Sequence, residues 1–155
     1  PSATVRLDFL TAGYPTEEEE VGSSFPLIGS FFPESYTSEP RLRIEAYRKL
    51  AQMREEIEID GFLEELKDRF GTPPDEVFAL TQETRIRCLT EEAGFDMIEV
   101  RKNEIYCRMI QRGKDGTKHY HRKAGQIPKL SSKEPLLKLN EIIRFLRIVH
   151  HGNKN

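Results

Sequence analysis

The segment EELKDRFGTPP, residues 64–74, gathers carboxylates on a short stretch of chain. Glu65 and Asp68 are three residues apart and Glu64 and Asp68 are four apart, so a helix places them on a shared face. Like charges at these spacings destabilise a helix by about 0.2–0.5 kcal/mol a pair, and its C-terminal end disfavours anions. Arg69, four residues after Glu65, relieves part of this cost. Such a face suits a partner's arginines, although charged helix faces are also common on surfaces.

A second group of residues could bind phosphates. Basic side chains surround Tyr120 in the segment RGKDGTKHYHRK, and an aromatic ring among cations can stack on a base. The alternative is a solvated hairpin. The cations are Arg112, Lys114, Lys118, Arg122 and Lys123.

His119 and His121 lie two residues apart and would point to the same side of a strand, as two metal ligands could. Two further ligands at metal spacing are missing, so a polar strand face is the preferred interpretation and we expect no metal. The sequence also lacks a GxxxxGK[ST] phosphate loop, a dinucleotide GxGxxG, an HExxH and a GxSxG motif. We therefore expect a non-catalytic domain without a cofactor.

The composition indicates a globular chain with a heavily charged surface. The 155 residues are 37% hydrophobic and 32% charged, enough for one domain with a core. Residues 1–100 hold 10 lysines and arginines against 22 acids, a balance of −12, whereas residues 101–155 hold 14 against 4, a balance of +10. This split predicts either two docking faces of opposite sign or mutual attraction within the fold.

The cellular setting is inferred from absences in the sequence. No apolar run approaches the roughly 20 residues that span a bilayer, and no basic and apolar leader is present. Cys88 and Cys107 form no CxxC pattern, which favours a reducing, cytoplasmic setting. The start at Pro1, followed closely by a strand-like segment, suggests a piece of a longer polypeptide.

The predicted elements are those of an α+β fold with a small, largely antiparallel sheet and several helices packed on one face. We expect strands over 5–10, 95–102 and 104–111, with 118–123 as a further candidate. Four helices are expected over 40–53, 61–70, 74–93 and 133–150, with caps at Ser38, Asp60 and Ser131 or Ser132.

The domain boundaries follow from composition. Residues 1–37 are a strand and an arm rich in Pro, Gly and Glu, whose run Glu17–Glu20 is expected to be solvated. Several aromatic residues of the arm should pin it to the domain. Residues 38–150 form the docking domain, and 151–155 a disordered tail. The arm's candidate anchors are Phe25, Phe31, Phe32 and Tyr36.

The segments FFPESYTSEPRLRIEAYRKLA and LEELKDRFGTPPDEVFAL resemble the C-terminal domain of the bacterial transcription-repair coupling factor (Mfd). That family's pattern is Pro-x-x-Tyr, an Arg-Leu-rich helix ending in Tyr-x-x-hydrophobic-Ala, and then Asp-Arg-Phe-Gly-x-x-Pro. The resemblance covers residues 32–94 and is looser outside them. The matching residues are Pro33, Tyr36, Arg41, Leu42, Tyr47, Leu50, Ala51, Asp68, Arg69, Phe70, Gly71 and Pro74.

The resemblance implies a regulatory role. Full-length proteins of that family are DNA-translocating ATPases that remove stalled RNA polymerase and recruit the repair protein UvrA. Their C-terminal domain folds back on a UvrB-like N-terminal module and covers the surface that UvrA uses. A bacterial, cytoplasmic and nucleoid-associated protein is thereby expected.

By position, the acidic residues that face arginines of that module correspond to Glu65 and Asp68, with Glu64 peripheral. Behind them Arg69, Phe70, Gly71 and Pro74 resemble a structural elbow. The family's longer insertion between the C-terminal strands is replaced here by the short basic segment, which the family does not assign. The alternatives to docking are a nucleic-acid-binding module that uses residues 101–133 and a structural domain that packs on its own motor.

Overall fold

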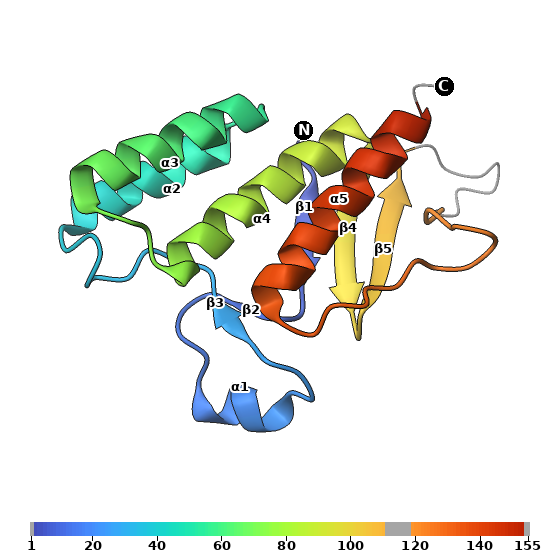
Figure 1. Cartoon of the computed structure of the whole chain (residues 1–155), viewed down its shortest axis with the longest axis horizontal. Helices are drawn as coiled ribbons and strands as arrows, with labels where there is room; N and C mark the ends of the chain where they lie inside the picture. The colour runs from blue at the N-terminus through green and yellow to red at the C-terminus, as the bar shows by residue number, and fades with distance from the viewer. Residues whose placement is uncertain (1, 111–118, 154–155) are drawn as a thin grey trace.

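A computed structural model describes residues 2–110 and 119–153 (Figure 1). Long helices lie on one side of a small sheet, and a short helical arm extends from the end where the sheet's hairpin turns. The elements in chain order are β1 (Thr4–Leu7), β2 (Leu10–Thr11), α1 (Glu17–Gly22), β3 (Ile28–Gly29), α2 (Pro40–Gln52), α3 (Glu56–Phe70), α4 (Asp75–Glu92), β4 (Phe95–Arg101), β5 (Glu104–Met109) and α5 (Pro135–Asn153).

The predicted α+β class is confirmed, and the main sheet is mixed. Its order is β1-β4-β5, with β4 and β5 antiparallel and β1 parallel to β4. The predicted hairpin between 95–102 and 104–111 is present. Lys102 and Asn103 at its turn have φ values of 48° and 64°, as a two-residue turn that follows the twist of the strands requires. β2 and β3 form a separate parallel pair.

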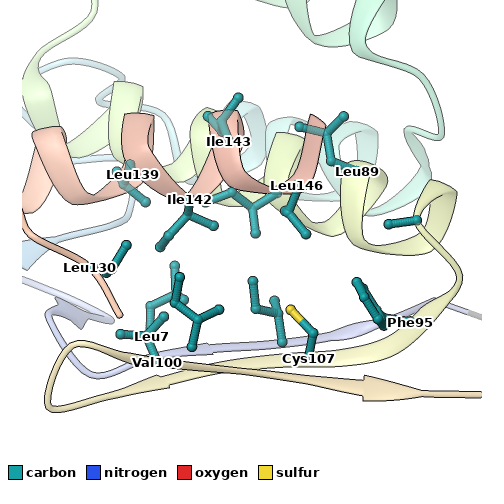
Figure 2. Packing of buried hydrophobic residues seen from close by; sticks show 14 of the residues in the cluster. Leu7, Leu89, Phe95, Val100, Cys107, Leu130, Leu139, Ile142, Ile143 and Leu146 are labelled. Carbon is teal, nitrogen blue, oxygen red and sulfur yellow. The ribbon is translucent and has the colours of Figure 1, made fainter. Parts of the chain in front are cut away.

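The main core lies between this sheet and helices α4 and α5 (Figure 2). Ile98 of β4 and Ile142 and Leu146 of α5 are fully buried, and the side chains of α5 point toward the strands. The apolar side chains of α5 lie on one face of the helix, so their burial determines which side of α5 meets the sheet. The far side of the sheet carries polar residues of β4 and β5, as expected for a half-buried sheet.

A second core cluster holds α2 and α3 against α4. Phe62 and Leu66 of α3 are buried there with Leu50 of α2 and Phe32 of the arm. Phe32 meets Phe62 edge to face, with ring centroids 6.4 Å apart. The helical hairpin that carries the acidic segment is therefore positioned by its own apolar cluster.

Two predicted helix starts were wrong. α3 begins at Glu56, four residues before the predicted cap at Asp60, because the Glu58 carboxylate accepts the backbone N–H of Glu55 at 3.2 Å and starts the helix earlier. The N-cap of α2 is Glu39 rather than Ser38, and Pro40 occupies its first turn.

Other boundaries also differ from the prediction. Pro74 caps α4 instead of opening it, and its carbonyl accepts the N–H groups of Val77 and Phe78. α5 begins at Pro135 and continues to Asn153, past the predicted end at 150. Around Tyr120 the chain makes an isolated bridge to Arg108, and residues 119–123 form no strand.

Aromatic side chains of the arm contact both core clusters of the domain. Phe25 contacts the main core, Phe32 is 3% exposed, and Tyr36 contacts the second cluster. The run Glu17–Glu20 forms the first turn of α1, with all four side chains exposed and Thr16 capping the helix. Across the described residues, every helix is too short or too polar to span a bilayer.

Candidate functional site

Helix α3 presents the predicted carboxylates at its C-terminal half. Glu64 and Asp68 are exposed and Glu65 is half-buried, while Phe62 and Leu66 on the opposite side enter the second core cluster. The acidic residues and the apolar residues therefore occupy different faces of one amphipathic helix. Because the apolar side is anchored, the carboxylates are held on a rigid element.

The carboxylates differ in how far their charge is already compensated. The Glu65 Oε1 atom lies 3.4 Å from Lys49 Nζ and 3.6 Å from an Arg69 guanidinium nitrogen. Such exposed pairs are worth about 0–1 kcal/mol each. Within the part of the chain that the structure describes, Glu64 and Asp68 have no ion pair. Glu64 and Asp68 are therefore the carboxylates most open to a partner's cation.

The surface beside this face offers no room for a substrate. The hollow between α2 and α3 next to Glu65 and Arg69 has a volume of about 20 Å³, which is space for about one water molecule. The surface can contact a macromolecule but cannot enclose a small molecule. We refer to Glu64, Glu65 and Asp68 as the acidic face.

The predicted elbow closes the helix directly after the acidic face. Gly71 has φ of 87°, a conformation that side chains rarely adopt. The Tyr36 hydroxyl donates to the carbonyl oxygens of Gly71 at 2.8 Å and Leu66 at 3.2 Å. The Arg69 guanidinium lies 5.0 Å from the ring centroid of Phe70, which is half-buried. Tyr36 thus fixes the turn, a role that the sequence did not assign to it.

Arg85, itself buried, forms an ion-pair network with the N-terminal half of α3, which sequence reasoning missed. Its guanidinium donates to Glu56 at 3.0 Å, Asp60 at 2.7 Å and Gln82 at 3.1 Å. Arg147 of α5 donates to the same Glu56 carboxylate at 2.6 Å. The network ties α3 to α4 and α5. The sequence did hold one signal for this network, because Arg85 lies in the middle of α4, a helix that is mostly buried.

Comparison with known proteins identifies the family. A profile described as "TRCF domain" matches residues 28–119, more than half of the chain. This chain belongs to the TRCF domain family. The match spans α2, α3 and α4 and so includes the acidic face and the elbow of this TRCF domain.

Curated relatives carry the same assignment. The transcription-repair-coupling factor of Mycobacterium bovis is 32% identical over 78 residues, covering 50% of this chain and 6% of its own length. That of Rickettsia prowazekii is 37% identical over 72 residues, covering 46% of the chain and 6% of its own length. The TRCF domain therefore spans a small fraction of these relatives.

A crystal structure of the C-terminal domain of a transcription-repair coupling factor resembles the whole fold. It matches with a TM-score of 0.61 over 97% of this chain and 96% of its own, at 18% sequence identity. At this identity the likeness concerns the fold. It extends the TRCF domain resemblance to β1 and α5, which lie outside the region matched by the family profile.

The basic segment of this TRCF domain is only partly described. Arg112, Lys114 and Lys118 lie outside the described residues, whereas Arg122 and Lys123 are exposed. The Tyr120 ring packs edge-on against Tyr106, with centroids 5.9 Å apart.

Other residues near this segment already have partners. The Arg101 guanidinium lies 4.4 Å from the Tyr106 ring centroid, and Arg101 and Arg108 form ion pairs with Glu99 and Asp96. Arg101 and Arg108 are thus already paired with neighbouring carboxylates.

The two histidines do not share a site. His121 packs between the rings of Phe95 and Phe145, each with a centroid 5.8 Å away, and His119 is exposed. Burial lowers the pKa of His121. No cluster of three metal-ligating side chains occurs among the residues described.

Proposed function

We propose that this domain is a non-catalytic regulatory domain of a transcription-coupled DNA repair translocase, which docks on the UvrB-like N-terminal module of its own polypeptide. In the docked state it masks the surface that UvrA uses and so inhibits the protein. The remainder of the full-length protein supplies the DNA-dependent ATPase and engages RNA polymerase and DNA. The family resemblance supports these roles.

The observation that carries the proposal is the exposed carboxylate of Asp68, without an ion-pair partner among the described residues, on the last turn of α3. The helix dipole disfavours an anion there, so this charge does not serve the stability of α3. A partner's arginine would compensate it through a charge-assisted hydrogen bond. Interfacial charges mainly set specificity and association rate, which suits a contact that has to open.

Reversing the charge of Asp68 tests the proposal. We expect Asp68→Arg to weaken binding of the domain to the UvrB-like module about tenfold, or about 1.4 kcal/mol, because an attraction to an arginine becomes a repulsion. Isothermal titration calorimetry at low salt measures the affinity. Glu64→Arg should act in the same direction. Glu65→Arg is less specific, since it also removes the contacts with Lys49 and Arg69.

Glu92→Arg is the matched control. Glu92 is exposed at the C-terminal end of α4, so its reversal changes the net charge equally on a different helix. If Asp68→Arg and Glu92→Arg weakened binding equally, the change in net charge alone would explain the effect. That result would contradict docking through the acidic face. If Asp68→Arg left binding unchanged, the docking contact would have to lie on another surface of the domain. Salt-sensitive DNA binding lost with Arg122→Gln and Lys123→Gln would favour the nucleic-acid alternative instead.

A further inference from the structure

A lysine-lined cavity lies at the end of the fold opposite the C-terminal ends of β5 and α5. The loop after α1, the β4–β5 turn and the first turn of α5 converge there (Figure 1). The cavity has a volume of about 460 Å³, within the size range of small-molecule sites. We call it the lysine cavity; its wall includes Ser24, Phe25, Lys102, Asn103, Lys133 and Lys138.

Lys138 is the unusual member of this wall. The residue is 1% exposed, and its Nζ atom has no hydrogen-bond partner among the described residues. The ammonium lies 4.3 Å from the ring centroid of Phe25 and 5.1 Å from that of Phe9. Contact with aromatic faces compensates part of the lost hydration, but three N–H donors remain without acceptors. A buried ammonium with unused N–H donors can take an anion as its acceptor.

The neighbouring charges reinforce this reading. Lys102 and Lys133 add two exposed cations to the same wall, and no acidic residue of the described chain lines it. Burial lowers the pKa of Lys138, and nearby Asp8 opposes this effect. The Asp8 carboxylate is itself engaged, because it accepts the backbone N–H of Lys102 at 2.8 Å.

Asn103 supplies a second unsatisfied group in the same cavity. Its Oδ1 atom is buried and accepts no hydrogen bond from the described residues. The wall thus holds a donor that lacks an acceptor and an acceptor that lacks a donor. A phosphate group that retains one proton offers both, with oxygens for the lysines and an O–H for Asn103. The positive end of the α5 dipole also favours an anion here.

We propose that the lysine cavity binds a phosphate group, held by Lys138 with Lys102 and Lys133. The site is built from elements other than α3 and is independent of the acidic face. The phosphate comes either from a free small anion or from a nucleic-acid backbone. Both offer oxygens to the lysines, but only the free anion retains the O–H for Asn103. On binding, the phosphate oxygens supply the acceptor that the buried Lys138 Nζ atom lacks.

The test is calorimetric titration of the chain with inorganic phosphate, and separately with a single-stranded oligonucleotide, against sodium chloride of matched ionic strength. We expect saturable one-to-one phosphate binding that Lys138→Met abolishes and Lys133→Gln weakens at least fivefold. Lys67→Gln, at an exposed lysine of α3, is the matched control and should bind like the wild type.

Thermal unfolding gives a readout that a purely structural lysine would not produce. Phosphate should raise the Tm of the wild type and of Lys67→Gln, and leave the Tm of Lys138→Met unchanged. Oligonucleotide binding that depends on Lys138, together with phosphate binding, would identify the backbone as the source; phosphate binding alone would identify a free anion. The proposal is overturned by wild-type binding no stronger than chloride explains, or by equal phosphate binding in Lys138→Met and Lys67→Gln.

Discussion

Phe62→Ala is expected to lower the free energy of unfolding by about 4 kcal/mol, the largest loss that we predict for a single change in this domain. The Phe62 side chain is 5% exposed and fills the cluster between α2, α3 and α4. Its removal leaves a cavity beside Phe32, which packs edge-on against it. Urea denaturation followed by circular dichroism measures the loss.

Ile57→Ala is the matched control for this prediction. Ile57 lies on the same helix and is 73% exposed, and its truncation to alanine also removes apolar carbons, half as many as Phe62→Ala. We expect a change within about 0.5 kcal/mol, as for surface positions in general. If both variants lost the same stability, the effect would arise from helix propensity rather than from packing. Docking should also depend on this core, because Phe62 anchors the helix that carries the acidic face. Phe62→Ala should therefore weaken docking although it alters no carboxylate.

The elements that the sequence predicted well are those whose signals are local. The apolar stripe of α3 follows from helical spacing, and the same spacing predicts the buried face of α5. The β4–β5 hairpin follows from alternation on both sides of Lys102 and Asn103. The acidic face was predictable for the same reason, since residues three and four apart share a helix face in any environment.

The features that were missed depend on residues distant in sequence. Alternation identifies β1 as a strand, but nothing in it specifies β4 as a parallel partner more than 90 residues away. The same applies to Glu65, whose ion pair with Lys49 comes from a neighbouring helix. The lysine cavity joins Phe25, Asn103 and Lys138, which no local pattern connects.

The sequence predicted that Asp60 has a polar role in α3, but it predicted the wrong partner for its carboxylate. An acidic residue before an apolar stripe is typical of a helix cap, and the sequence predicted one there. In the fold the helix starts at Glu56, and Asp60 instead accepts a hydrogen bond from Arg85 across the helix interface. An aspartate can cap a helix or pair with an arginine, and the position of Arg85 in the fold determines that Asp60 does the second.

Arg85→Met is expected to lower the free energy of unfolding by about 2 kcal/mol. Removing one partner of a fully buried ion pair costs about 3–5 kcal/mol, and the value here is smaller because Asp60 is 63% exposed and Arg147 still pairs with Glu56. Urea denaturation at neutral pH measures the loss. Arg144→Met, at an exposed position of α5, is the matched control and should change stability within about 0.5 kcal/mol.

The pH dependence of the same variant separates charge from packing. Burial raises the pKa of Glu56, but the hydrogen bonds and charges of Arg85 and Arg147 outweigh it, so its pKa lies below the ordinary value. A lowered carboxyl pKa contributes stability above the ordinary glutamate value, and this contribution is lost as the pH falls through the lowered pKa. The difference between wild type and Arg85→Met should therefore shrink in acid. A difference that stays constant down to the pH at which Glu56 is protonated would show that the arginine stabilises the helix interface through its packed side chain rather than through its charge.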